Sequence, residues 1–247
     1  MTLIGGGLAA GGANAMNMVY DRDIDALMVR TKNRPLVTGV ISPPAAAVFA
    51  SRLEIAAFFL LWTTVSLLSV VLAVGATAFD VGVYTMWLKR SSPQNIVIGG
   101  AAGAVPVLVG WSAVTGHLGL APLIMFGIIF LWTPPHFWAL AIRYRQDYAK
   151  ARVPMLPAVA DLKAVTRQII GYTLALWILS VLLAPVAHLS IRYLIVAMVL
   201  GASFFGHACA LGRDPSTKRA MKVFGFSISY LTVLFVAMGI DAVVLHN

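Results

Sequence analysis

The chain has 247 residues, of which 60% are apolar and only 11% are charged, and its mean hydropathy is +0.88. Water-soluble domains carry roughly a quarter charged residues, so this composition excludes an aqueous fold and indicates a lipid bilayer as the surroundings. The net charge of +9 would indicate nucleic acid only if the basic residues formed one patch, and they are spread over several loops. We therefore expect no nucleic-acid partner. The single cysteine, Cys209, excludes an internal disulfide.

Eight apolar runs predict eight membrane helices. In chain order they cover 1–19, 44–62, 65–88, 93–115, 119–142, 166–188, 191–212 and 220–244. The first run is short for a span and has no basic leader, so we expect a helix whose outer end is missing. Its glycines, at positions 5–7 and 11–12, favour close packing against a neighbouring helix, which we expect to be an absent preceding one. The sequence thus predicts an all-α, polytopic transmembrane bundle that forms a single domain over 1–247.

The basic residues predict the orientation of this bundle. Sixteen of the 18 Lys and Arg residues fall in 20–43, 88–92, 143–167 and 213–222. These four stretches are alternate connections of the eight-helix arrangement, so the positive-inside rule places them in the cytoplasm. Most of the acidic residues lie on the same side. We expect a multi-pass protein of a bacterial inner membrane with its site at the cytoplasmic face.

Asn17, Asp21 and Asp25 recur every four residues, which places them in one stripe of about 80° on a helix. Grouped carboxylates repel one another unless a cation joins them, and Mg²⁺ is commonly held by carboxylates together with substrate phosphates. Arg30 and Arg34 follow, and arginine binds phosphate oxygens through a bidentate fork. The pattern predicts a Mg²⁺–diphosphate site with Asn17, Asp21 and Asp25 as metal ligands. The alternative is a solvated helix end, although carboxylates there oppose the helix dipole.

The Asn-x3-Asp-x3-Asp pattern after an early membrane helix resembles the first motif of the UbiA superfamily of intramembrane prenyltransferases. Five stretches resemble its haem O synthase branch in particular: 13–28, 30–36, 84–100, 110–116 and 132–141. The resemblance implies a nine-helix fold, about eight helices of which are present here. It implies transfer of a farnesyl group from farnesyl diphosphate to a vinyl group of haem B, giving haem O, with Mg²⁺ as cofactor. It also implies a downstream haem A synthase as a partner, and a substrate-binding role for Asn14.

The second acidic motif of the superfamily falls at 141–148. Asp147 matches its last acid, so the resemblance implies a catalytic role for Asp147 beside the first motif and a substrate-binding role for Tyr148. Arg143 stands where another carboxylate is expected; it contacts diphosphate or a haem propionate, or it is an ordinary cytoplasmic anchor. Two alternatives remain open. A related enzyme that prenylates an aromatic quinone precursor would have a second acid there, and a transporter would have broken helices near the midplane.

His136 lies seven residues before Arg143, about 10 Å into the membrane along its predicted helix. Ionisable groups at such depth usually face the interior and mark function. A neutral imidazole is a ligand for haem iron, so we expect His136 to bind the haem substrate. The alternative is a histidine that only hydrogen-bonds a neighbouring helix. Glu54 and Asp80 also fall inside predicted helices, and the sequence assigns no role to either.

Overall fold

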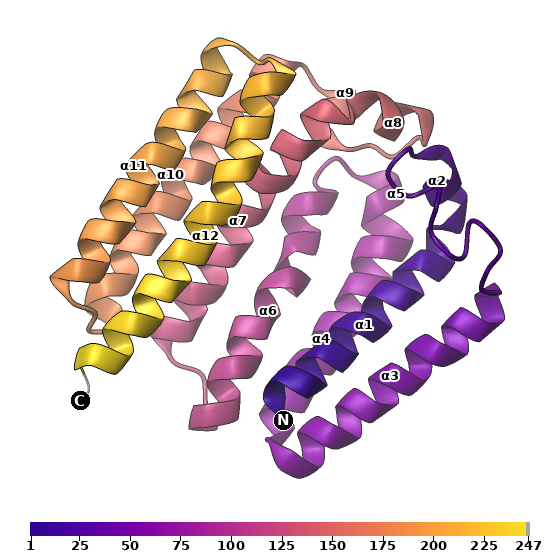
Figure 1. The fold of residues 1–247 in the computed structure, drawn as a ribbon, viewed down its shortest axis with the longest axis horizontal. Helices are drawn as coiled ribbons and strands as arrows, with labels where there is room; N and C mark the ends of the chain where they lie inside the picture. The colour runs from indigo at the N-terminus through magenta and orange to yellow at the C-terminus, as the bar shows by residue number, and fades with distance from the viewer. Residues whose placement is uncertain (246–247) are drawn as a thin grey trace. The chain divides into compact units, whose positions relative to one another are not determined.

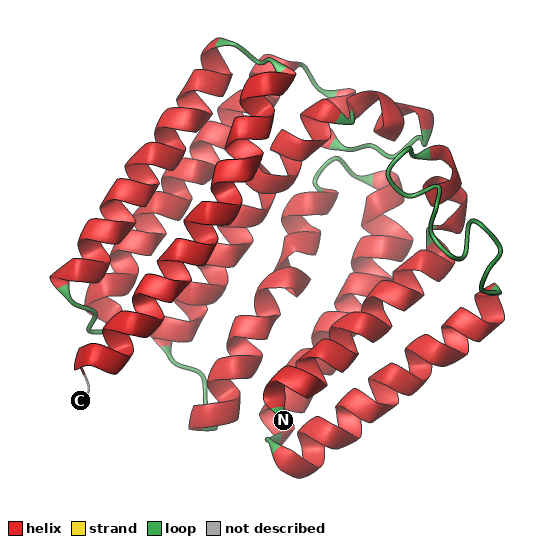
Figure 2. Cartoon of the chain, viewed as in Figure 1, coloured by secondary structure: helices red, strands yellow, loops and turns green. Residues whose placement is uncertain are grey.

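The computed structural model describes residues 1–245, and helices joined by loops account for that whole range (Figure 2). With the labels of Figure 1, the elements in chain order are α1 (Thr2–Tyr20), α2 (Arg22–Leu27), α3 (Pro43–Thr64), α4 (Leu67–Ala78), η1 (Phe79–Leu88), α5 (Lys89–Ser91), α6 (Asn95–Thr115), α7 (Leu120–Arg143), α8 (Arg145–Lys150), α9 (Leu156–Val159), α10 (Leu162–Val186), α11 (Ile191–Arg213) and α12 (Thr217–Leu245). Because no described residue is in a strand, the predicted all-α class is confirmed. All eight predicted helices are present near their expected positions.

Seven of the helices are long and apolar enough to cross a membrane. They are Pro43–Thr64, Leu67–Ser91, Asn95–Thr115, Leu120–Arg143, Leu162–Val186, Ile191–Arg213 and Thr217–Val244. At most 39% of the apolar window of any of these helices is buried inside the protein, so most of their apolar surface must face lipid. The chain is a multi-pass membrane protein. The glycine-rich α1 is not among the seven.

The chain forms two compact units, which are described separately. The first contains Met1–Leu118 together with Gln146–Met155. In this unit α1 packs on α3, because glycines of α1 admit side chains of α3. A Cβ atom at Gly5 would lie 2.6 Å from Leu61, and one at Gly12 would lie 2.6 Å from Glu54 Oε1. The helix that these two glycines accommodate is therefore α3, whereas a Cβ atom at Gly6 or Gly7 would meet nothing within 4 Å.

Serine caps and a glycine set several helix boundaries in this unit. Ser42 accepts a hydrogen bond from the backbone N–H of Ala45 at the start of α3. Ser66 accepts one from Ser69 and thereby begins α4 only two residues after α3 ends. At the end of α6, Gly116 has φ +73°, a left-handed conformation that glycine adopts without strain.

The helix that continues α4 changes its geometry at η1, which is a ten-residue π-helix. In a π-helix the backbone hydrogen bonds join residues i and i+5. The side chains of η1 therefore point in directions that differ from those of an α-helix. Such segments are found frequently at functional sites. Asp80, Tyr84 and Thr85 all lie in η1, and its last residue adjoins Lys89.

The second unit contains Gly119–Arg145 and the chain from Leu156 onward. Its core is a four-helix bundle in which α7 and α11 each pack against both α10 and α12. Trp138, Tyr193, Tyr230 and Phe204 are among the largest fully buried side chains. The hydroxyl groups of the two tyrosines find partners at one serine. Ser180 Oγ lies 2.7 Å from Tyr230 Oη, and Tyr193 Oη donates to the Ser180 carbonyl at 3.0 Å.

Candidate functional site

The acidic motif, residues 17–25, lies at the junction between α1 and α2. Asp21 separates the two helices, and the backbone N–H groups of Asp21 and Asp25 donate to the carbonyls of Asn17 and Asp21, both at 2.8 Å. The spacing of one helical turn therefore continues across the junction. Asp21 is only 1% exposed and Asp25 only 3%. A purely solvating role for these two carboxylates does not fit such burial, because charged groups are rarely buried without partners.

Each acid of the motif faces a basic side chain. Lys89 pairs with Asp21 Oδ2, and Arg34 Nη1 lies 2.7 Å from Asp25 Oδ2. Arg90 forms a bidentate pair with Asp23, at 2.7 and 2.8 Å, and also donates to the Tyr20 carbonyl. The basic residues thus offset the charge of the motif. Their N–H groups are also the donors that bind phosphate oxygens.

Burial and pairing move the pKa values of two of these acids in opposite directions. Burial raises the pKa of the Asp21 carboxyl, against the attraction of Lys89, which lowers it. The hydrogen bonds from Arg90 lower the pKa of Asp23 to about 2. Asp23 is more exposed, with 64% of its side chain accessible. Asp21 is therefore the acid for which an additional positive charge would matter most.

The Asn17 amide is held by two groups of η1. Asn17 Nδ2 donates to Asp80 Oδ2 at 2.9 Å, and Thr85 Oγ1 donates to Asn17 Oδ1 at 2.7 Å. A carboxylate can only accept, so it must face the amide nitrogen, and this fixes which way the amide points. The second lone pair of Asn17 Oδ1 remains available.

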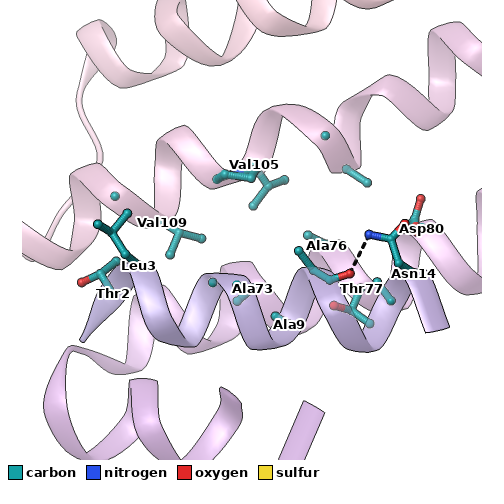
Figure 3. A pocket seen from close by; sticks show the side chains of 18 of the residues that line it. Thr2, Leu3, Ala9, Asn14, Ala73, Ala76, Thr77, Asp80, Val105 and Val109 are labelled. Carbon is teal, nitrogen blue, oxygen red and sulfur yellow. Dashed lines mark hydrogen bonds between the residues drawn. The ribbon is translucent and has the colours of Figure 1, made fainter. Parts of the chain in front are cut away.

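A cavity of about 560 Å³ extends from this network along α1, between α1, α4 and α6 (Figure 3). Asn14 and Asp80 lie at one end and Thr2 and Leu3 at the other. Most of the lining between these ends is glycine, alanine, valine and proline. Its volume is in the range of ligand-binding pockets. From Thr2 to Asn17 it follows 15 residues of helix, or about 22 Å. The cavity is polar at one end and apolar along its length.

The three predicted metal ligands retain oxygen lone pairs. Asp21 Oδ1 is buried and has no hydrogen-bond partner, and Asp25 Oδ1 accepts no hydrogen bond from the described residues. Asn17 Oδ1 keeps the free lone pair noted above. Within residues 1–245, no three His, Cys, Asp or Glu side chains converge as a metal cluster. Carboxylate and amide oxygens are the type of ligand that a hard cation such as Mg²⁺ takes together with phosphate and water.

The structure brings several other predicted residues of this unit near the motif. Arg30 is exposed, and it interacts electrostatically with Tyr84 of η1, as does the buried Tyr148. Asn14 lines the cavity and donates to the Ala10 carbonyl at 2.9 Å. Asp147 is half-buried, and its carboxylate makes no hydrogen bond with described residues.

His136 belongs to the second unit, where it is buried among aromatic rings. It stacks on Trp132 at 4.1 Å and on Phe224 at 4.6 Å between centroids. Its Nδ1 lies 2.7 Å from Ser227 Oγ, and Ser227 uses its only hydroxyl hydrogen to donate to the Phe224 carbonyl at 2.6 Å. Nδ1 must therefore carry the proton and donate to Ser227. This tautomer leaves the lone pair of Nε2 free, as an iron ligand requires.

Arg143, at the end of α7, has no carboxylate partner among the described residues and lies 5.6 Å from the Tyr144 ring. Its guanidinium therefore remains available to an anion.

The sequence interpretation missed four contributors to the acidic site: Lys89, Arg90, Asp80 and Thr85. The first two were counted only as cytoplasmic charges, although they lie in one of the stretches that carry the family resemblance. Asp80 had one available signal, its position inside an apolar run, because an intramembrane acid usually has a function. Thr85 had no comparable signal.

The fold and the site define an intramembrane helical protein with a buried, cation-partnered acidic motif beside an apolar cavity. A family model described as the UbiA prenyltransferase family matches residues 1–235. The chain belongs to this family, as its motifs led us to expect. A protoheme IX farnesyltransferase of Frankia alni is 50% identical over 99% of this chain and 86% of that protein. One of Gloeobacter violaceus is 51% identical over 99% of this chain and 81% of that protein.

Two solved structures are similar in fold. A digeranylgeranylglyceryl phosphate synthase matches with a TM-score of 0.78 and 22% identity, over 95% of this chain and 82% of that one. A UbiA homologue from Archaeoglobus fulgidus, bound to DMAPP and Mg²⁺, matches with a TM-score of 0.65 and 16% identity, over 96% and 86%. At these identities the likeness concerns the fold, and it agrees with the helical architecture described above.

Proposed function

We propose that this protein transfers the farnesyl group of farnesyl diphosphate to a vinyl group of haem B, giving haem O. The observation that carries the proposal is the pairing of buried carboxylates at Asp21 and Asp25 with an apolar cavity that begins beside Asn17. A prenyl diphosphate has the same two parts, a highly charged head and an apolar tail. Relatives named protoheme IX farnesyltransferase support the choice of haem as acceptor.

In this proposal the acidic motif binds the diphosphate through Mg²⁺. Asn17, Asp21 and Asp25 would hold the metal, and a metal in this position supplies positive charge that stabilises the departing diphosphate. Asp147 and Tyr148 complete the site. Basic side chains donate hydrogen bonds to the phosphate oxygens, and they belong to Arg30, Arg34 and Lys89. The diphosphate competes there with Asp25 for Arg34 and with Asp21 for Lys89. Asp80 and Thr85 hold the Asn17 amide in its orientation.

The farnesyl tail occupies the cavity along α1, and Asn14 lies where tail and head meet. His136 binds the haem iron through Nε2, and Arg143 pairs with a haem propionate. The rings of Trp132 and Phe224, stacked on the two faces of the imidazole, hold it in position and exclude water from it. The small side chains of α1 and α6 that line the cavity, such as Gly6 and Gly103, leave room for the methyl branches of the prenyl chain.

The reaction breaks the bond between C1 of the farnesyl group and the diphosphate oxygen. A new bond joins C1 to the terminal vinyl carbon, and a cation is left on the vinyl carbon next to the ring. Water adds to that carbon and loses a proton, which leaves a hydroxyl group on the new side chain. Atoms and charge balance with diphosphate as the leaving group.

We place the site at the cytoplasmic face of the bacterial inner membrane, because the basic connections gather at that end of the helices. Haem O would then pass to a downstream haem A synthase. The test is conversion of haem B to haem O by membranes that contain the protein, farnesyl diphosphate and Mg²⁺. Membranes with the Asp21→Asn variant, inserted to the same level, should form no haem O. Prenylation of 4-hydroxybenzoate in place of haem B would reject the haem assignment and favour a quinone pathway.

A further inference from the structure

A second cavity, of about 430 Å³, lies between the inner ends of α10 and α11 in the second unit. Three basic side chains line it: Lys163 and Arg167 at the start of α10 and Arg213 at the end of α11. The two helices run antiparallel, so these residues meet at the basic end of the bundle. The rest of the lining is Thr166, Ile170, Cys209 and Gly212.

Within the described residues the three cations have no anionic partner. None of them forms an ion pair with a carboxylate within residues 1–245, although other basic residues, such as Arg219 with Asp214, do so. Arg167 Nε donates to the Lys163 carbonyl at 3.3 Å, which leaves its terminal nitrogens free. Two acids lie near these cations along the chain. Asp214, next to Arg213, pairs with Arg219, and Asp161 caps α10, where it accepts from the Lys163 N–H at 3.1 Å. Like charges that converge in this way repel one another unless an anion joins them.

The depth of the cavity identifies the anion. Lys163 is the second residue of one membrane span, and Arg213 is the last residue of the next. Both lie where the hydrocarbon region gives way to the lipid headgroups. Ile170, which also lines the cavity, lies seven residues further along the same span than Lys163. A Cβ atom at Gly212 would lie 2.8 Å from Ile170, so the helices are in close contact there. A ligand needs a negative head and an apolar continuation, as a phospholipid has.

We propose that this cavity binds the phosphate headgroup of an anionic phospholipid, whose acyl chains follow α10 and α11 into the bilayer. Basic pockets between membrane helices bind anionic lipid headgroups by this arrangement. The site is separate from the acidic motif and does not depend on the proposed reaction.

Native mass spectrometry of the purified full chain can test this, with dioleoyl-phosphatidylglycerol and dioleoyl-phosphatidylcholine as probes. We expect one tightly bound phosphatidylglycerol and weaker binding of phosphatidylcholine. The variant with Lys163→Gln, Arg167→Gln and Arg213→Gln should bind phosphatidylglycerol about 100-fold more weakly. A control with Arg192→Gln, Lys218→Gln and Lys222→Gln loses the same charge outside the cavity and should retain the affinity. Equal losses in both variants, or equal affinity for both lipids, would overturn the proposal.

The unmutated protein offers an independent measurement, because its only cysteine, Cys209, lines the cavity. Phosphatidylglycerol in nanodiscs should slow alkylation of Cys209 relative to nanodiscs of phosphatidylcholine alone. An unchanged rate would contradict the proposal even if the triple variant failed to fold. Inorganic phosphate should give no comparable protection; if it protects as well as phosphatidylglycerol does, the site belongs to a soluble anion and the lipid assignment is wrong.

Discussion

The acidic motif of the first unit and the surroundings of His136 in the second unit stabilise buried ionisable groups in opposite ways. At the motif, carboxylates are kept close to cations, as Asp21 is to Lys89 and Asp25 to Arg34. Around His136 there is no charged partner among the described residues; the ring is packed between aromatic faces and its proton is directed to Ser227. At the acidic motif the cations can move from the carboxylates to an incoming anion. At His136 the neutral ring offers a nitrogen lone pair.

This contrast matches the two proposed substrates. A diphosphate brings several negative charges, so its site needs cations that are already in place, together with oxygens for a metal. Haem iron needs a neutral nitrogen, and burial without a carboxylate neighbour favours the neutral form of an imidazole. The predictions below test whether the two regions have separate roles, in order of the expected effect.

The largest effect is expected at Asp21. Asp21→Asn removes the negative charge but keeps the shape, and it should lower farnesyl transfer by about 100- to 1,000-fold, the usual range for removing one electrostatic contact to the transition state. Haem binding, measured by its absorption spectrum, should remain within about 2-fold. Asp214→Asn, which removes an exposed acid of the other unit, is the matched control. Near-normal turnover of Asp21→Asn would remove the basis of the diphosphate assignment.

His136→Ala should show the reverse pattern. We expect haem affinity to fall by at least about 100-fold, because loss of a direct ligand should exceed the 10- to 100-fold effect of losing an outer partner. Binding of farnesyl diphosphate in the presence of Mg²⁺ should be unchanged. Ser227→Ala leaves the ligand but frees Nδ1, so its effect on haem affinity should be smaller, about 10-fold. If His136→Ala instead weakened diphosphate binding and kept the haem spectrum, the two roles would be exchanged.

The sequence predicted the helices well because hydropathy and basic flanks are local properties. It also identified Asn17, Asp21 and Asp25 from their spacing, since that spacing is read along a single helix. The partners were not predicted, because they come from distant segments. Lys89 and Asp21 are separated by 68 residues, and His136 and Ser227 by 91. The π-helical geometry of η1, which decides which way Asp80 and Thr85 point, has no signature in an apolar run.

The division between α3 and α4 shows the same limit on a smaller scale. In the sequence, 44–62 and 65–88 are almost continuous, because only Thr63 and Thr64 separate them. In the structure the boundary is made by Ser66, whose side chain caps α4. A serine cap is a weak signal inside an apolar stretch, because serine is also tolerated within membrane helices.

An effect of intermediate size is expected from the groups that orient Asn17. Thr85→Val removes the donor to Asn17 Oδ1 at nearly constant volume, and Asp80→Ala removes the acceptor for Nδ2. Each should raise the Mg²⁺ concentration needed for half-maximal transfer by about 10-fold, with little loss of turnover at saturating Mg²⁺. Thr63→Val, which removes a hydrogen bond to the Phe59 carbonyl of α3 outside the cavity, is the control. A fall in turnover at every Mg²⁺ concentration would indicate a folding defect and not a positioning role.

The smallest effects are expected in the pH dependence at Asp21 and Asp23, which lie two residues apart. Burial raises the pKa of Asp21, so protons compete with Mg²⁺ for it above the ordinary carboxyl range, and Mg²⁺ affinity should fall as the pH is lowered toward that range. Asp21→Asn should weaken this pH dependence. An affinity that does not vary with pH in the unmutated protein would contradict the assignment of Asp21 as a ligand.

The pKa of Asp23 is shifted in the opposite direction, and its titration should affect only the stability of the fold. Its pKa is about 2 in the folded protein and about 3.8 otherwise, so its pair with Arg90 stabilises the fold above pH 3.8, and this contribution is lost as the pH falls toward 2. Because both side chains are partly exposed, Asp23→Asn should cost no more than about 1 kcal/mol and leave Mg²⁺ affinity unchanged. Thermal unfolding of both proteins from pH 7 to pH 3 should show a constant difference in midpoint that shrinks only below about pH 4. A difference that grew on acidification would mean that Asp23 is destabilised by its surroundings, as Asp21 is, and that the pair with Arg90 does not determine its charge.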